Sequence, residues 1–126
     1  MTDYLGIVIE QCLRDPAAAK ELRVVKTRRP RSWVFLLVEV PEHELDHQIR
    51  ILQANMVSDD TWYAHYFREN ELVVVFRDAV FRLSTDPSSW GPAVEHGLAS
   101  GIPREQLDFT PRTRAEAERF FGISPT

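Results

Sequence analysis

Apolar and polar residues alternate most regularly over positions 62–84, which read WYAHYFRENELVVVFRDAVFRLS. Aromatic and β-branched residues favour strands, and the two polar interruptions contain Asn70 and Asp78, which tolerate turns. The pattern predicts three antiparallel strands in a meander, joined by two-residue turns at Glu69-Asn70 and Asp78-Ala79. Side chains alternate between the two faces of a strand. The predicted buried face consists of Tyr63, His65, Phe67, Leu72, Val74, Phe76, Phe81 and Leu83.

The opposite face of these strands has a mixed composition. Its residues are Trp62, Ala64, Tyr66, Val73, Val75, Arg77, Val80 and Arg82. A three-residue turn would exchange the faces of one strand, so the side on which His65 lies depends on the register.

The N-terminal segment predicts a helix over positions 3–14 with Thr2 as its N-cap. Its apolar residues recur at the spacing of a buried helical stripe: Leu5, Val8, Ile9 and Cys12. Asp15 precedes Pro16, and the residue before a proline avoids helical geometry, so the helix should end there. Cys12 would then be a small core residue.

Three further helices are predicted over positions 41–55, 90–100 and 113–121. Proline suits the first turn of the first two helices, a capping box at Thr113 opens the third, and Gly101 and Gly122 are expected stops. The predicted buried stripes are Leu45, Ile49, Leu52 and Met56 in the first, and Trp90, Val94 and Leu98 in the second.

Two more strands are predicted over positions 22–27 and 33–40, as a hairpin around a basic loop. The second of them, WVFLLVEV, is apolar on both faces and should be central, and the first resembles an edge strand. A short final strand is predicted over positions 107–109. The resulting order, αββαβββαβα, predicts an α+β fold with a mainly antiparallel sheet. It approximates a ferredoxin-like (split βαβ) variant, with its helices on one face of the sheet.

Length and composition set the class of protein. The chain of 126 residues is expected to form a single domain over positions 1–126. One cysteine excludes a disulfide framework, no apolar run reaches the roughly 20 residues of a membrane helix, and the N-terminus is not that of a signal peptide. These features predict a cytoplasmic protein that does not associate with membranes. The net charge of −4 argues against a general nucleic-acid binder.

Several segments together resemble a family of small uncharacterised prokaryotic α+β proteins. They are WYAHYF, LVVVF, WGPAVEHGLASGIPREQLDF and the N-terminal YLGIVIEQCLRDP. The resemblance implies a compact α+β domain and assigns no catalytic residue.

Two groups of residues are candidate binding sites. Six of the twelve residues from Lys20 to Arg31 are basic. Arg28, Arg29 and Arg31, with Trp33 for stacking, could contact phosphate or nucleic acid, although charged runs are more often solvated surface. On the mixed face of positions 62–84, aromatic and basic side chains could bind a planar or anionic ligand or a protein. They are Trp62, Tyr66, Arg77 and Arg82. The alternative is that the C-terminal helix covers this face.

Positions 43–47 read HELDH and match the zinc-binding pattern H-E-x-x-H. His43 and His47 would lie opposite the apolar stripe of their helix, towards solvent, and Asp46 is charged where the pattern prefers an uncharged residue. A third ligand would have to come from Asp59, Asp60 or Glu71. The prediction is therefore that this segment is not a catalytic zinc site.

No nucleophile motif or phosphate loop is present. The sequence favours a binding protein without cofactor or catalytic residues, whose partner is another protein or a second copy of itself. A phosphate or nucleic-acid binder acting through residues 20–33 is an alternative. A zinc hydrolase acting through His43, Glu44 and His47 is a less favoured one.

Overall fold

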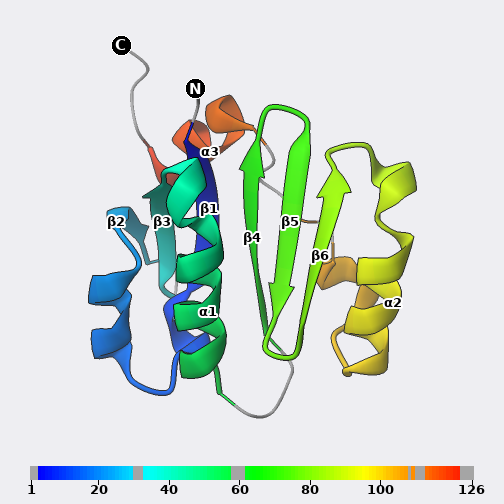
Figure 1. Cartoon of the computed structure of the whole chain (residues 1–126), viewed down its shortest axis with the longest axis horizontal. Helices are drawn as coiled ribbons and strands as arrows, with labels where there is room; N and C mark the ends of the chain where they lie inside the picture. The colour runs from blue at the N-terminus through cyan, green and yellow to red at the C-terminus, as the bar shows by residue number, and fades with distance from the viewer. Residues whose placement is uncertain (1–2, 30–32, 58–61, 108, 110–112, 123–126) are drawn as a thin grey trace.

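The computed structural model describes residues 3–29, 33–57, 62–107, 109 and 113–122, and has the predicted α+β class (Figure 1). Within these ranges the chain forms one antiparallel sheet of six strands in the order β2-β3-β1-β4-β5-β6. The strands are β1 (Tyr4–Ile9), β2 (Val24–Arg28), β3 (Phe35–Val40), β4 (Tyr63–Arg68), β5 (Glu71–Phe76) and β6 (Ala79–Ser84). The α-helices are α1 (Leu45–Asn55), α2 (Gly91–Ala99) and α3 (Arg114–Phe121).

Five short 3-10 segments complete the described structure. They are η1 (Glu10–Cys12), η2 (Pro16–Glu21), η3 (Glu42–Glu44), η4 (Pro87–Ser89) and η5 (Arg104–Gln106). None of the helices in the described ranges has the length and apolar character needed to cross a membrane.

The predicted N-terminal helix is wrong, because Tyr4–Ile9 forms the central strand β1. It pairs with β3 on one side and with β4 on the other. Val8 packs into the core on one face of the sheet and Ile7 into the core on the other. A strand buried on both faces is a continuous apolar run, which periodicity does not separate from a helix. Thr2, the predicted cap, lies outside the described residues.

Cys12 is fully buried in η1, as expected of a core residue. Loss of hydration raises the pKa of its thiol to about 12, so the thiol is inert at neutral pH.

β4, β5 and β6 pair antiparallel in succession. The first turn has the predicted register, with Phe67 opposite Leu72. The second turn is Arg77-Asp78 rather than Asp78-Ala79, so Phe76 lies opposite Ala79 and not opposite Phe81. The β5 residues are therefore paired with β6 residues two positions earlier than predicted. Because side chains alternate between the two faces, a shift of two residues leaves every β6 side chain on its predicted face.

Helices cover both faces of the sheet, so the prediction that they lie on one face is wrong. The stripe of α1 packs against the face that carries Tyr66 and Val73, whereas Trp90, Ala93 and Ala117 pack against the opposite face. In Figure 1, α1 lies in front of the sheet. Leu45 and Ile49 therefore pack on the face that carries Tyr66, and not on the face of Phe76. The reason is that both faces of β4 and β5 are apolar and need a covering layer.

Tyr66 is anchored beneath α1. Its hydroxyl donates a hydrogen bond to Gln48 Oε1 at 2.7 Å, and Gln48 Nε2 donates to the carbonyl oxygen of Leu22 at 3.1 Å. Tyr66 lies opposite Gly6 across the strands. A Cβ atom at Gly6 would lie 2.5 Å from two carbons of the Tyr66 ring, so glycine leaves the space that this ring occupies.

The buried side of α2 differs in part from the predicted stripe. Trp90 is buried, but Leu98 is exposed, and the small residues Ala93 and Gly97 face the core instead. A Cβ at Gly97 would meet the Leu107 side chain at 2.6 Å, so this helix approaches the following segment closely. Leu107 and Phe109 belong to no strand, contrary to the prediction, and Asp108 lies outside the described residues.

Both ends of α3 follow the sequence signals. The Thr113 hydroxyl accepts a hydrogen bond from the backbone N–H of Glu116 at 3.1 Å, and Gly122 ends the helix with φ of 70°. Gly101 likewise has a positive φ of 93° after α2. Glycine adopts this conformation at low cost.

Candidate functional site

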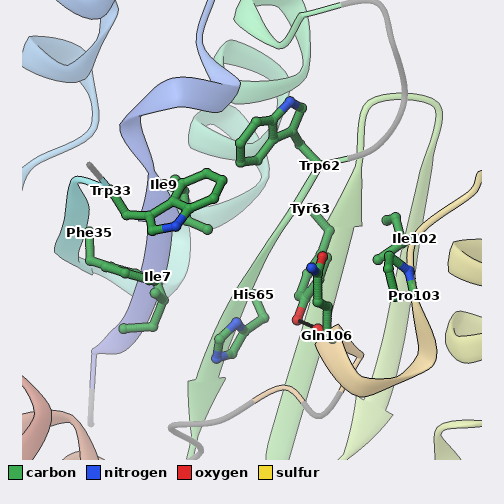
Figure 2. A pocket seen from close by; sticks show the side chains of 10 residues that line it. All are labelled: Ile7, Ile9, Trp33, Phe35, Trp62, Tyr63, His65, Ile102, Pro103 and Gln106. Carbon is green, nitrogen blue, oxygen red and sulfur yellow. Dashed lines mark hydrogen bonds between the residues drawn. The ribbon is translucent and has the colours of Figure 1, made fainter. Parts of the chain in front are cut away.

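A cavity of about 440 Å³ opens on the face of the sheet opposite α1 (Figure 2). The strand register builds its floor, because Ile7 lies opposite His65 and Ile9 lies opposite Phe35. Cross-strand partners present their side chains side by side on one face. The described lining residues are Ile7, Ile9, Trp33, Phe35, Trp62, Tyr63, His65, Ile102, Pro103 and Gln106.

The cavity lies between two segments that cover the rest of this face. Phe120 of α3 packs edge-on against Phe35, with ring centroids 5.2 Å apart. On the other side, the chain that follows α2 supplies Ile102, Pro103 and Gln106. Figure 2 shows these three side chains opposite those from β1 and β3, with Tyr63 and His65 between them.

Two tryptophans lie together at one end of the cavity. Trp33 precedes β3 and Trp62 precedes β4, and their rings meet edge to face with centroids 5.4 Å apart. Trp33 is 44% exposed, so part of its ring faces solvent. The sequence predicts Trp33 and Trp62 in two separate binding sites, whereas in the structure both side chains line the same cavity.

The cavity wall formed by the chain after α2 is held in place by polar and aromatic contacts. The Tyr63 hydroxyl donates a hydrogen bond to the carbonyl oxygen of Gln106, and the Tyr63 ring meets that of Phe109 edge to face at 5.3 Å. The backbone N–H of Ile102 donates to the carbonyl oxygen of Gly97 at 3.0 Å. The Tyr63 hydrogen bond ties the segment after α2 to β4, and the Ile102 hydrogen bond ties the same segment to α2.

His65 is the most polar group of the floor and is only 4% exposed. Its ring stacks on Phe67 at 5.9 Å and lies 6.4 Å from that of Tyr63. The described lining residues include no Asp, Glu, Lys, Arg, Ser, Thr or Cys. They therefore provide neither a nucleophile beside a base nor a charged catalytic group.

A second histidine, His96, is not among the described lining residues of the cavity. Its Nε2 lies 2.9 Å from Asp78 Oδ1, and its ring packs against Phe76 at 4.6 Å.

The predicted basic site is not assembled in the described residues. Both carboxylate oxygens of Glu44 accept from Arg23 Nη2 at 2.8 Å, and the guanidinium of Arg28 lies over the Phe120 ring at 4.5 Å. Arg29 is exposed, and Arg31 lies outside the described residues. Two of the basic side chains are thus used in contacts within the fold.

The site predicted on the mixed face of β4–β6 is also dispersed. Tyr66 is buried beneath α1, and Trp62 lines the cavity. Arg82 is exposed and pairs with Asp46, whereas Arg77 is half-buried at the β5–β6 turn. The helix that covers this face is α1, and α3 instead packs with Leu5 and Leu37 on the opposite face.

The HELDH segment spans η3 and the start of α1. His43 and His47 are both exposed, and Glu44, the residue between them that the zinc-hydrolase alternative requires, pairs with Arg23. No three His, Cys, Asp or Glu side chains among the described residues are grouped to hold a metal ion. Asp59 and Asp60 lie outside those residues.

Glu71, the other proposed zinc ligand, belongs to a network that joins β1, β4, β5 and η3. The Tyr4 hydroxyl donates to Glu71 Oε1 at 2.7 Å, Arg68 donates to Glu71 Oε2 at 2.7 Å, and Arg68 also donates to Glu42 at 3.2 Å. The bonds from Tyr4 and Arg68 lower the pKa of Glu71, while burial and then Glu71 raise the pKa of Tyr4. These contacts connect elements of the fold.

Sequence reasoning missed most of the cavity lining. Ile7 and Ile9 fall within the helix predicted over positions 3–14, and Ile102, Pro103 and Gln106 lie between two predicted elements. The alternation that placed Tyr63 and His65 on one face was the usable signal. No protein-family model, curated protein or solved structure matches the chain.

Proposed function

We propose that this protein acts by binding rather than by catalysis, and that it binds an apolar group in the cavity lined by Trp33, Trp62 and His65. The observation that carries the proposal is a volume of about 440 Å³ with aromatic and aliphatic walls and no charged residue among those described. Ligand pockets of proteins have volumes of roughly 300–1,000 Å³, apolar walls and few polar groups.

The fixed walls support this function. Tyr63 is bonded to Gln106, Trp33 rests against Trp62, and Phe35 against Phe120. A site that is already ordered loses little conformational entropy when a ligand enters it. The burial of apolar surface from both ligand and wall then provides the driving force.

Filling the cavity tests this function. We expect 2-naphthalenemethanol or 1-octanol to bind the wild-type protein saturably at one site, measured by isothermal titration calorimetry. Ile9 is half-buried in the lining, and Ile9→Trp should weaken binding by about tenfold or more because the indole occupies ligand space.

Ile51→Trp is the matched control, because Ile51 is half-buried in α1 and packs against the core on the other side of the sheet. It should leave the affinity unchanged. Circular dichroism would verify that both variants fold. If neither compound bound the wild type saturably, or if Ile9→Trp bound with the same affinity as the wild type, the proposal would be contradicted.

Association with a protein partner or a second copy is the second candidate function. Val25 is 54% exposed on the edge strand β2, and Val80 is 39% exposed on the edge strand β6. An edge strand can pair with another chain. This candidate ranks second because β2 has a bulge between Val24 and Lys26, and bulges hinder edge pairing. On β6, the backbone of Ser84 is bonded to Ser89 and Trp90.

Sedimentation equilibrium over a wide range of concentrations tests self-association. If the edge of β2 carries it, the wild type should dimerise and Val25→Lys should shift the protein to monomer, because the ammonium group would lose its hydration in the interface. If the wild type were monomeric at every concentration, self-association through the edge of β2 would be ruled out.

Phosphate or nucleic-acid binding and zinc hydrolysis have less support than either candidate. Arg23 and Arg28 are engaged within the fold, and His43 and His47 are exposed on the surface without a convergent third ligand in the described residues.

We also infer a ferredoxin-like variant for the sheet. β3 and β4 both pair antiparallel with β1, so they run parallel to each other on its two sides, and α1 connects them. Two parallel strands joined by a helix, with one strand between them, is the split βαβ unit. The support is topological, and it implies no shared function.

A further inference from the structure

We propose that the ligand of the cavity is an uncharged small molecule of about two fused aromatic rings. This inference rests on the proposed binding function and adds the chemical class of the ligand. It follows from three properties of the cavity: its volume, the rings in its walls and the charge of its lining.

The volume favours a free molecule over a single side chain of a partner protein. An apolar cavity of about 150 Å³ is large enough to bind benzene. The cavity here, at about 440 Å³, is roughly three times that size. One aromatic side chain would leave much of it unfilled, and unfilled apolar space forfeits dispersion contacts. A fused two-ring molecule with a small substituent fits the volume better.

The walls favour a planar ring over an alkyl chain. Half of the ten described lining residues are aromatic: Trp33, Phe35, Trp62, Tyr63 and His65. Ring pairs in edge-to-face or offset stacked geometry contribute beyond the area that they bury. The wall rings already use such contacts among themselves, as between Trp33 and Trp62 at 69°. An aromatic ligand can extend them, whereas a saturated ligand gains only the burial of area.

The lining favours an uncharged ligand. None of its described residues is Asp, Glu, Lys or Arg. Arg28, the cross-strand partner of Phe35, lies over Phe120 of α3, so its guanidinium is engaged beyond the wall. A carboxylate or ammonium group in the cavity would lose its hydration without a charged partner among these residues. A hydroxyl or amide substituent is compatible with the polar side chains of His65 and Gln106.

A matched series of compounds tests the inference by isothermal titration calorimetry at pH 7. The series is 2-naphthalenemethanol, 2-naphthoate, 2-naphthylmethylammonium, the saturated decahydronaphthalene-2-methanol and 1-octanol. We expect the first compound to bind at least about tenfold more tightly than either charged analogue, because each charge is buried without a partner. It should also bind more tightly than the saturated alcohol.

A Trp33→Leu variant reports on the aromatic contribution, because Trp33 is partly exposed and its loss leaves the core intact. We expect this variant to lose most of the preference for the aromatic over the saturated alcohol. Phe81→Leu is the control, because Phe81 is a partly buried ring outside the lining, and the preference should persist in it.

The outcomes separate this inference from the function on which it rests. Equal affinity for a charged analogue or for the saturated alcohol would overturn the uncharged aromatic ligand, while binding at the cavity would stand. Failure of every compound in the series, including 1-octanol, to bind would overturn the proposed function itself.

Discussion

Replacement of Phe76 by Ala is expected to lower the free energy of unfolding by roughly 3–5 kcal/mol, the range for deleting a large buried ring. Phe76 is 2% exposed. Its ring lies 4.6 Å from that of His96 and 5.9 Å from those of Tyr63 and Phe81. Removing it would leave a cavity between β5 and α2 that these neighbours cannot fill without moving. Urea denaturation followed by fluorescence measures the loss.

The control is Val80→Ala, which removes an exposed side chain from the neighbouring strand β6. It should change the stability by less than about 0.5 kcal/mol, as surface substitutions usually do. If the denaturation midpoint of Phe76→Ala equalled that of the wild type, the assignment of this residue to the core would be wrong.

Gly6→Ala should have the second largest effect, a loss of roughly 1–3 kcal/mol or more from overpacking. The added methyl group would lie 2.5 Å from ring carbons of Tyr66 and 2.8 Å from Val38 Cγ2. Both neighbours are fully buried. The Tyr66 ring cannot move aside easily, because its hydroxyl is bonded to Gln48. Thermal and chemical denaturation of the variant measure the effect.

Gly91→Ala is the matched control, because a Cβ at Gly91 meets no atom within 4 Å. It should be neutral or slightly stabilising, since alanine favours the helix more than glycine does. In a Tyr66→Leu background, Gly6→Ala should cost less, because the ring that it strikes is absent. If Gly6→Ala lowered the stability of the Tyr66→Leu variant as much as that of the wild type, the clash with the Tyr66 ring would not be its cause.

The parts of the fold that were predictable from sequence are those with strong local signals. The alternation over positions 62–84 placed Tyr63, Phe67 and Val74 on one face correctly, and Thr113 and Gly122 marked the ends of α3. Strand β1 was not predictable in this way. Its run YLGIVI is buried on both faces, and only its pairing with β3 and β4 decides against a helix.

The candidate site was the least predictable part, because no short segment contains it. Trp33 and Trp62 are 29 positions apart and approach each other only through the pairing of β3 and β4 with β1. Gln106 is brought to the same site because its carbonyl oxygen accepts a hydrogen bond from the Tyr63 hydroxyl. Long-range pairing of this kind follows from the topology of the sheet rather than from local sequence patterns. Because β1 was predicted to be a helix, the part of the cavity floor that β1 forms was not predicted either.

The central claim, that the cavity is the binding site, is tested most directly by nuclear magnetic resonance of the indole N–H groups. The chain contains three tryptophans. Trp33 and Trp62 line the cavity, whereas Trp90 is buried outside the lining with its Nε1 bonded to the carbonyl oxygen of Ser84 at 2.9 Å. Titration with 2-naphthalenemethanol should shift the indole resonances of Trp33 and Trp62 saturably and leave that of Trp90 almost unchanged. Unchanged Trp33 and Trp62 resonances at saturating ligand, or equal shifts of all three, would contradict the claim.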